Sequence, residues 1–514
     1  MASTPLFRIG ACVSRAGVMA SLAGLLLLGG CVVGPDYERP DAPGDQAYSM
    51  AADTAPTTSG EAQMFERAGE VRADWYRVFG SDKLDQLIED ALADSPTLAA
   101  ARARLQSAQQ AVVAGRAALL PQVDASAGVS RQRASGIELG IDDPSFINTF
   151  NLYQGRVSAR YDLDIFGKTR REIEQTQARL DFARFEALDA YVTLVNNIVA
   201  SAIAEAGVNA AIDTTKQIID SQQRTLDIVG RQIEYGVAVD ADAAQIQTRL
   251  ARTRASLEPL RKQRAIAVNR LAVLTGSTPG TFADPHFHID ELTLPATLPV
   301  SLPSALVRQR PDILAAEAMV HAASAQIGIA AANLLPDVSI GAYYSREGLS
   351  LGDLSDPVTA LWQLGASASA PLFAGGRLRA QKRAAGDAYV AALADYRATV
   401  LGAFGDVADS LRSLESDARA LQAQQTAADQ ARRNLDTVRA RVDNGAATYI
   451  ALYTAQVQYQ DTLLDVVDAR VTRYSDSAAL FRALGGGWWN ADDPLDMADA
   501  GHAEPRRMSA DRPG

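Results

Sequence analysis

The chain has few of the residues that crosslink a fold or hold a metal ion. Its 514 residues include two cysteines, Cys12 and Cys31, and four histidines. Both cysteines lie in or at the end of an N-terminal leader, so the rest of the chain offers no thiol for a disulfide or a thiolate metal site. The histidine pair His286 and His288 lies in a proline-rich stretch that is typical of a solvated surface. We therefore expect neither a metal nor a cofactor.

The chain also lacks the patterns of common catalytic and nucleic-acid-binding sites. No glycine-rich phosphate loop follows a predicted strand, and no serine occupies a nucleophile elbow. The formal net charge is −12, and loss of a leader containing Arg8 and Arg15 would make it more negative. Because a nucleic-acid-binding surface needs positive charge, this composition argues against one. The sequence predicts that the protein is not an enzyme.

Beyond the leader, long hydrophobic runs are missing as well. The closest approach, around residues 190–208, is interrupted by Asn196, Asn197 and Glu205. A membrane-spanning helix needs roughly 20 consecutive apolar residues, so we expect no such helix. If the chain crosses a bilayer, it must do so with β-strands closed into a barrel, because a barrel pairs every backbone polar group.

The leader has the features of an export signal. Arg8 and Arg15 precede an apolar stretch over residues 16–28, and two glycines stand directly before Cys31. A cysteine at the cut resembles the lipoprotein signals of bacteria, and this resemblance implies cleavage before Cys31 and acylation of that residue. Each buried CH₂ of an acyl chain contributes ~0.8 kcal/mol to membrane attachment. The alternative is an ordinary secretory signal with a cysteine there by chance.

The rest of the chain repeats itself once. Four short segments recur in the same order, about 210 residues later, which predicts a duplicated unit that covers most of the chain. The pairs are Leu119-Leu120-Pro121-Gln122-Val123 with Leu334-Leu335-Pro336-Asp337-Val338, Phe166-Gly167-Lys168 with Phe373-Ala374-Gly375-Gly376-Arg377, Tyr235-Gly236-Val237-Ala238 with Asn444-Gly445-Ala446-Ala447, and Leu274-Thr275-Gly276 with Ala483-Leu484-Gly485.

Each unit contains a very long helix, over 168–235 and 377–444. At ~1.5 Å per residue such a helix is ~100 Å long, far longer than a compact domain requires. The helix that follows each turn has apolar residues in alternating steps of four and three, which is typical of one helix packed along another. A polar residue interrupts this seam at Thr253, Arg264 and Gln460. We expect two long rods per unit and four per chain.

Each unit also contains two stretches with strand periodicity. In residues 122–130, valine and alanine alternate with polar side chains, and the other three stretches follow the same pattern. One apolar and one polar face over about ten residues is typical of a strand that spans a membrane around a wet lumen. Four strands cannot close a barrel with room inside, so we expect the chain to share its barrel with copies of itself. A soluble sandwich with one buried face is the alternative.

These patterns predict an α+β membrane protein with an internal two-fold repeat. The expected segments are a signal peptide over 1–30; a lipidated extended tether over 31–72; a first repeat over 73–283 with strands at about 121–134 and 149–165 and a helical hairpin at 168–276; a connector over 284–303; a second repeat over 304–487 with strands at about 336–347 and 357–373 and a hairpin at 377–485; and a disordered tail over 488–514.

Several motifs carry a resemblance to a known family. The segment 31–40, Cys-Val-Val-Gly-Pro-Asp-Tyr-Glu-Arg-Pro, follows the lipid site, and Trp75-Tyr76 with Phe79 and Leu84 opens the fold. Arg308-Gln309-Arg310-Pro311-Asp312-Ile313 opens the second repeat, and 371–377 joins strand to helix. The chain thereby resembles the TolC/OprM-like outer-membrane factors, including their NodT-type lipoproteins, over nearly all of the mature sequence.

The resemblance implies a homotrimer with a shared twelve-stranded β-barrel in the bacterial outer membrane and a helical barrel in the periplasm. It implies the passive exit duct of a tripartite efflux pump, which works with a periplasmic adaptor protein and an inner-membrane transporter of the RND type. Two other classes stay open: a pore for polypeptide secretion and a structural envelope lipoprotein. The amphipathic strands count against a structural spacer, and the lipoprotein start favours small-molecule efflux by analogy.

The same resemblance places the periplasmic mouth at the two helix turns. The adaptor-facing residues would be Gly236, Val237, Ala238, Gly445, Ala446 and Ala447.

By position, Ile450 would form an apolar constriction in the pore. Thr454 stands where relatives often have an aspartate, so the acidic ring is partly missing. Asp443 and Asp242 could supply charge instead, or could be ordinary solvated residues at helix ends.

Overall fold

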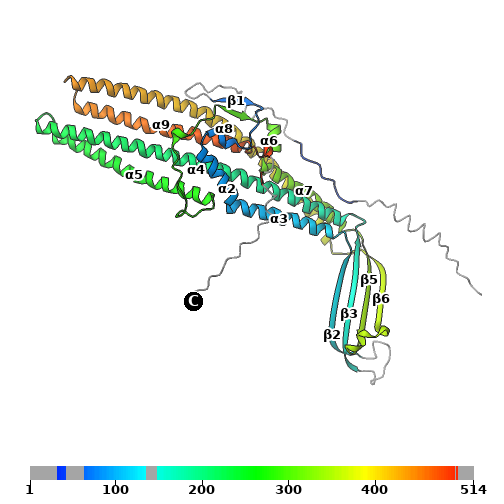
Figure 1. Ribbon diagram of the computed structural model, residues 1–514. Helices are drawn as coiled ribbons and strands as arrows, with labels where there is room; N and C mark the ends of the chain where they lie inside the picture. Colours follow the sequence, from blue (N-terminus) through cyan, green and yellow to red (C-terminus); the bar gives the residue numbers. More distant parts are fainter. Residues whose placement is uncertain (1–31, 42–62, 135–147, 492–493, 496–514) are drawn as a thin grey trace, which may run out of the picture. The chain divides into compact units, whose positions relative to one another are not determined.

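The computed structural model describes residues 32–41, 63–134, 148–491 and 494–495 (Figure 1). The signal peptide, Cys31 and the tail beyond residue 495 lie outside the described residues. The chain forms two compact units, each built from separate segments. Of the described residues, the strand unit takes 32–39, 108–134, 148–180 and 319–393, and the helix unit takes 40–41, 63–107, 181–318, 394–491 and 494–495. Each unit therefore draws on both sequence repeats, because the long helices pass from one unit into the other.

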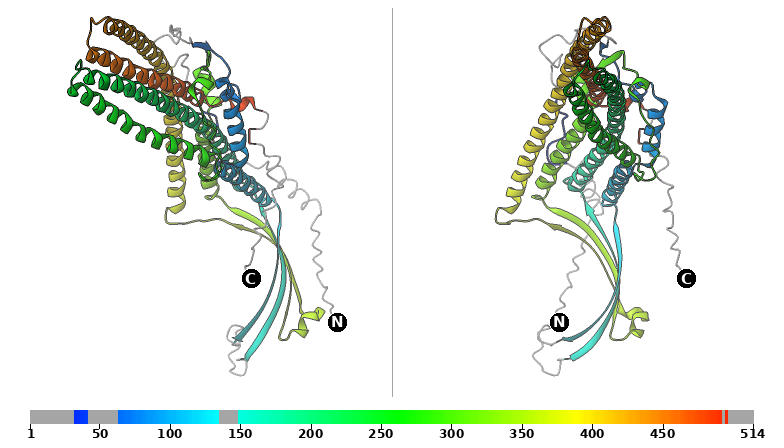
Figure 2. Two further views of the ribbon diagram at one scale, coloured as in Figure 1. Left: turned by 60° about the vertical axis from the view of Figure 1, so that its left-hand side comes forward. Right: turned by 90° about the vertical axis from the view of Figure 1, so that its left-hand side faces the viewer.

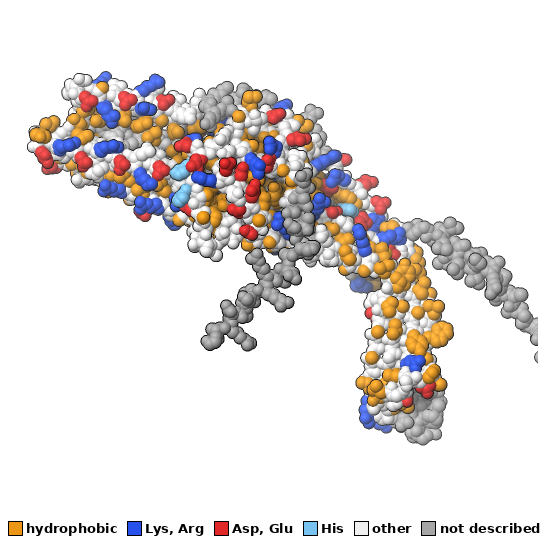
Figure 3. Space-filling model, in the orientation of Figure 1, with side chains coloured by type: hydrophobic (Ala, Val, Ile, Leu, Met, Phe, Trp, Pro, Cys, Tyr) orange, Lys and Arg blue, Asp and Glu red, His pale blue; other side chains and the backbone are white. Residues whose placement is uncertain are grey.

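The strand unit contains a four-stranded antiparallel sheet in the order β2-β3-β5-β6 (Figures 1 and 2). The strands are β2 (Gln122–Ala134), β3 (Asn148–Leu163), β5 (Asp337–Gly348) and β6 (Ala360–Ser369). The last strand is shorter than expected from the sequence, because Pro357–Thr359 forms a 3₁₀ turn, η6, and Pro371 lacks the N–H of a ladder residue. Figure 3 shows many hydrophobic side chains on the visible surface of these strands.

The long helices form pairs of equal length. The pairs are α3 (Pro96–Ala117) with α7 (Pro311–Ala332), 22 residues each; α4 (Lys168–Glu234) with α8 (Arg377–Asp443), 67 residues each; and α5 (Asp240–Leu274) with α9 (Tyr449–Ala483), 35 residues each. The observed ends of α4 and α8 each lie one residue before those that the sequence predicts. Within the helix unit, the hairpins α4–α5 and α8–α9 run side by side (Figures 1 and 2).

Two helices, α4 and α7, are long and apolar enough to cross a membrane by length and composition alone. The sequence predicted no such helix, because Asn196, Asn197 and Glu205 interrupt the apolar stretch of α4. In each helix, 67% of the most apolar window is buried within the chain, as in the core helices of soluble proteins.

The short elements of the helix unit correct two sequence expectations. Part of the predicted tether forms β1 (Met64–Arg67), which pairs in parallel with β4 (Thr297–Val300) from the connector. The predicted disordered tail begins instead with an ordered 3₁₀ turn, η7 (Trp488–Asn490), because the Trp488 indole N–H donates to the carbonyl of Gln309 at 2.7 Å. Both errors concern segments whose order depends on partners far away in the sequence.

The core of the helix unit is aromatic near the start of the fold. Trp75 and Phe79 in η1 (Trp75–Phe79) are at most 2% exposed, and Trp75 stacks on Phe481 with ring centroids 5.0 Å apart. The unit also includes α2 (Asp82–Asp94), η4 (Ile289–Glu291) and α6 (Pro303–Gln309). The motif that opens the second repeat has a structural role here, because Arg310 bridges Asp312 at 2.7 Å and Asp406 at 2.9 Å.

Candidate functional site

The two turns between long helices have the same backbone geometry. Gly236 and Gly445 both have φ of 70°, in the left-handed region that glycine adopts easily. The N–H of Gly236 donates to Ile233 and that of Val237 to Gln232, the paired bonds of a glycine-terminated helix. Gly445 and Ala446 repeat this pattern with Val442 and Arg441 as acceptors. Both long helices therefore end in the same left-handed glycine turn.

An apolar cluster, here called the tip cluster, joins the two hairpins close to these turns. Its buried members are Val229 of α4, Ile246 of α5 and Tyr453 of α9, each at most 5% exposed. Ile450, Ala238 and four further apolar residues pack against them (the four are Leu226, Ile233, Ala243 and Val457). Because three long helices contribute to it, the cluster holds the ends of both hairpins together.

The four proposed pore residues differ in their surroundings. Ile450 is half-buried against the tip cluster, and Thr454 is exposed, with its hydroxyl donating to the Ile450 carbonyl at 2.8 Å. Asp443 is exposed at the last residue of α8. Asp242 is half-buried and accepts the N–H of Val239 at 3.4 Å, as a residue in the first turn of α5. Asp242 therefore has a local capping role, whereas Asp443 has its carboxylate in solvent.

The turns differ in what they expose. Around the first turn, Tyr235, Val237 and Val239 are 82%, 73% and 62% exposed. The second turn carries the polar Asn444 and the small Ala446 in the corresponding places. A group of exposed apolar side chains at the end of a long helix is an unusual surface for a protein in water, and such patches commonly mark contact sites.

Behind the tip cluster, polar side chains cross between the hairpins. Gln222 of α4 donates to Gln460 of α9 at 3.1 Å, and both residues are buried. Thr225 donates to Gln456 at 3.0 Å in a second buried contact. Sequence reasoning identified Gln460 as an interruption of the apolar seam, but could not supply its partner, which lies 238 residues away. These bonds offset part of the cost of burying polar groups in the seam, although the Gln222 Oε1 atom has no hydrogen-bond partner among the described residues.

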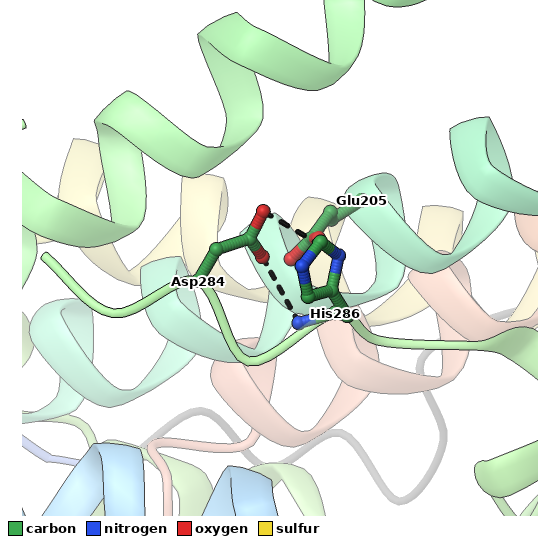
Figure 4. Close-up of side chains that lie close together, drawn as sticks. All are labelled: Glu205, Asp284 and His286. Carbon is green, nitrogen blue, oxygen red and sulfur yellow. Dashed lines mark hydrogen bonds and ion pairs between the residues drawn. The ribbon is translucent and has the colours of Figure 1, made fainter.

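A charge cluster around the buried Glu205 joins α4 to the connector (Figure 4), and Arg264 of α5 contacts it. Glu205 is 0% exposed. One carboxylate oxygen of Glu205, one of Asp284 and a ring nitrogen of His286 all lie within 4.8 Å of one another. This donor set alone could hold a cation. However, the Arg264 guanidinium already donates to Asp284 and contacts His286, and lies 3.6 Å from Glu205. The cluster is therefore centred on a cation that the chain itself supplies.

The cluster perturbs both carboxyl groups in opposite directions. Burial away from water, together with the neighbouring Asp284 carboxylate, raises the pKa of Glu205 to about 7. Burial alone would also raise the pKa of Asp284, but the His286 N–H, Glu205 and Arg264 together lower it. His288 is exposed and takes no part in this group. The sequence shows Arg264 as an interruption of an apolar seam and Glu205 as an interruption of an apolar run, but it does not show that the two side chains lie together.

Comparison with known proteins gives consistent matches over the whole body of the chain. A family model described as "Outer membrane efflux protein" matches residues 87–277 and 302–486. The pyoverdine export outer membrane protein OpmQ of Pseudomonas aeruginosa is 30% identical over 474 residues, which cover 91% of this chain and 97% of OpmQ. The probable outer membrane lipoprotein SilC of Salmonella typhimurium is 26% identical over 472 residues, which cover 91% of this chain and 98% of SilC. The solved outer-membrane channel OprN aligns with a TM-score of 0.80 and 25% identity, covering 89% of this chain and 100% of OprN.

Proposed function

This chain belongs to the outer membrane efflux protein family, and from that premise we propose that three copies enclose one passive exit duct. The protein lies in the outer membrane and serves the export of solutes. Its two matched segments, and its three pairs of helices of equal length, support a duplicated unit.

The two edge strands of the four-stranded sheet support the proposal that several copies share one barrel. Among the described residues, β2 and β6 each pair with one strand only, so each presents an open edge. Open edges in lipid would leave backbone groups without hydrogen-bond partners, at several kcal/mol each. Joining β6 of one copy to β2 of the next removes all edges once three copies close a ring of twelve strands. The side chains of one face would then contact lipid and those of the other would line water.

The duct is passive in this proposal. The hairpins of three copies would form a helical tube, and the energy would come from an inner-membrane transporter, for which the RND type is our choice. A periplasmic adaptor would join the two. Exposed Tyr235, Val237 and Val239 at the first turn offer it an apolar contact. We also propose that Cys31 is lipidated, which would add a second attachment to the membrane.

Oligomeric state and conductance test the duct directly. Native mass spectrometry of the purified protein in detergent should give three copies of the chain, and the protein should form ion-conducting channels in planar bilayers. A monomer that conducts ions would refute the shared barrel, and a trimer that does not conduct would refute the duct. Deleting the gene and profiling sensitivity to a panel of small molecules separates efflux from polypeptide secretion.

The gate is proposed to be apolar. Three copies of Ile450 around the axis would make a narrow collar that resists wetting and so resists ions. Asp443 is the competing candidate, because its carboxylate is exposed. Single-channel recording should show higher conductance for Ile450→Ser and little change for Asp443→Asn. If only Asp443→Asn opens the channel, the gate is electrostatic.

A bulky substitution tests whether the two helix turns form the periplasmic mouth. A Gly445→Trp protein should remain trimeric but lose efflux, since a large side chain at the mouth blocks the adaptor or the pore. Normal compound export by this variant would contradict the assignment of the turns to the mouth.

A further inference from the structure

The segment that follows Cys31, residues 32–37, packs against the rest of the strand unit. The N–H of Val33 donates to the carbonyl of Phe166 at 3.2 Å, in the turn where β3 passes into α4. Val32 lies against Gly167, where a Cβ atom would come within 2.8 Å of the valine side chain. The expected extended tether is therefore docked at its start, on the end of the sheet where every strand is joined to a helix.

Arg171, in the first turn of α4, organises this contact. Its side chain is only 5% exposed and forms an ion pair with Asp36 at 2.8 Å. It also donates to the backbone carbonyls of Val33 at 3.3 Å and Gly34 at 3.4 Å. Glu174 accepts a further bond at 2.7 Å. Two backbone carbonyls and the Asp36 carboxylate thus bind the segment to one buried guanidinium, and charge-assisted hydrogen bonds of this kind are stronger than neutral ones.

Two glycines allow the segment to approach so closely. Gly34 has φ of 100°, and a Cβ on it would lie 2.4 Å from the Cα of Gly328 in α7. A Cβ on Gly328 would in turn lie 2.9 Å from the Arg171 side chain. Beyond them, Tyr37 stacks on His321 with ring centroids 4.2 Å apart, and His321 contacts Glu174 at 3.1 Å. Backbone, ring and ion-pair contacts thus fix the same six residues, Val32–Tyr37.

The matching place in the second repeat carries no such cover. Leu372 and Phe373 are 98% and 91% exposed, and among the described residues nothing lies within 4 Å of a Cβ built on Gly375 or Gly376. Within one chain, only the first of these two strand-to-helix junctions is covered by the N-terminal segment.

From this geometry we infer that Val32–Tyr37, Gly167, Arg171, Glu174, His321 and Gly328 form an anchor clamp. The clamp fixes the chain one residue after Cys31, so that the acyl chains enter the bilayer beside the helix-joined end of the sheet. Consecutive Cα atoms are about 3.8 Å apart, so the anchor has almost no freedom to move away from that level. Arg171 is a positioning residue in this scheme. The inference rests on the proposed lipidation of Cys31 and on the membrane position of the strands.

A spin label tests the docking. Glu38 is exposed and next to the clamp, and the acylated mature chain has no other thiol, so Glu38→Cys can be labelled alone in the full protein in detergent. The nitroxide spectrum should be immobilised in this parent and in Arg170→Ala, the matched control, whose arginine pairs with Asp164 at 3.0 Å. It should become mobile in Arg171→Ala. An equally immobile label in Arg171→Ala would overturn the clamp.

An insertion tests whether the clamp sets the position of the anchor, and leaves every clamp residue unchanged. Six residues, Val-Gly-Ser-Gly-Ser-Gly, are inserted between Cys31 and Val32 in one protein and after Asp41 in the control. Only the first insertion should reduce the fraction of protein that assembles as trimer in outer membranes. Equal assembly, or equal losses, in the two proteins would overturn the positioning role.

Failure of the anchor clamp can be distinguished from failure of the proposed duct. An unmodified Cys31 in the mass spectrum of the amino terminus would overturn the anchor clamp, while a conducting trimer would leave the duct intact. A lipidated protein that fails to conduct would instead refute the duct, and its spin-label result would still decide whether Arg171 holds the segment.

Discussion

The helix unit and the strand unit reach their stability in different ways. In the helix unit, large side chains such as Trp75, Phe79 and Leu84 are buried within one chain. In the sheet, Val123, Trp362 and Leu364 remain 66%, 76% and 69% exposed. Exposed apolar surface on this scale is not stable in water on its own and usually marks a surface to be covered. The helix unit buries its largest aromatic side chains within one chain, whereas in our proposal lipid and further copies of the chain cover the sheet.

Removing a large aromatic side chain should separate the two units most strongly. Trp75→Ala should destabilise the helix unit by about 3–5 kcal/mol, because it removes a fully packed ring from the core. Trp362→Ala, on the exposed surface of β6, should leave the helix unit unchanged. Hydrogen exchange resolved by peptide measures each unit separately. Equal loss of protection in the helices of both variants would contradict the comparison.

A charge on one face of β6 should test what covers the sheet. Leu364→Arg puts a cation on the face that we assign to lipid, where it costs about 2–4 kcal/mol near the middle of the bilayer. Gln363→Arg, one residue away, puts the same charge on the opposite face. Only Leu364→Arg should lower the amount of trimer recovered from outer membranes. If Gln363→Arg has the larger effect, the two faces are assigned the wrong way round.

Changing pH should act on the helix unit through Glu205. Because its pKa in the folded protein is raised to about 7, the folded state holds a proton that the unfolded chain releases near its ordinary value of 4.5. The free energy of unfolding should therefore fall as the pH rises from about 4.5 to about 7, by at most about 1.4 kcal/mol per pH unit. Glu205→Gln should reduce this slope.

A second carboxyl group contributes to the pH dependence of the unfolding free energy that remains in Glu205→Gln. Burial and the Asp476 carboxyl raise the pKa of Asp417 to about 7, so this group acts in the same pH range. Some slope should therefore persist in Glu205→Gln and decrease further when Asp417→Asn is added. Urea unfolding of the helices at a series of pH values measures it. Glu258→Gln on α5, where the side chain is 70% exposed, is the control and should leave the slope unchanged.

Alanine at glycines with positive φ should give the smallest effects and a contrast between the units. Gly445→Ala should cost about 1 kcal/mol, because the backbone is left-handed but no atom lies within 4 Å of the new Cβ. Gly34→Ala should cost more, since its Cβ would lie 2.4 Å from the backbone of Gly328. Thermal unfolding measures the first and the Glu38→Cys spin label the second. Equal mobility of the label in the Gly34→Ala protein and its parent would contradict the close packing.

The sequence alone determined the elements that depend on local pattern. The long helices, their glycine turns and the alternating strands could be predicted because backbone geometry imposes periods of 3.6 and 2 on the residues that face one neighbour. Proline and glycine marked where those periods stop, at Pro121, Gly236 and Gly445. These features involve residues close together in the chain.

Tertiary structure decided which distant residues became partners. The pairing of β1 with β4, the docking of Trp488 on Gln309 and the contact of Asp36 with Arg171 join positions that share no local pattern. The same is true of Glu205, which interrupts an apolar run in the sequence and lies 3.6 Å from Arg264 in the folded chain. A buried charge or a docked segment is stable only when desolvation is offset by a specific partner, and the folded chain alone brings that partner within reach.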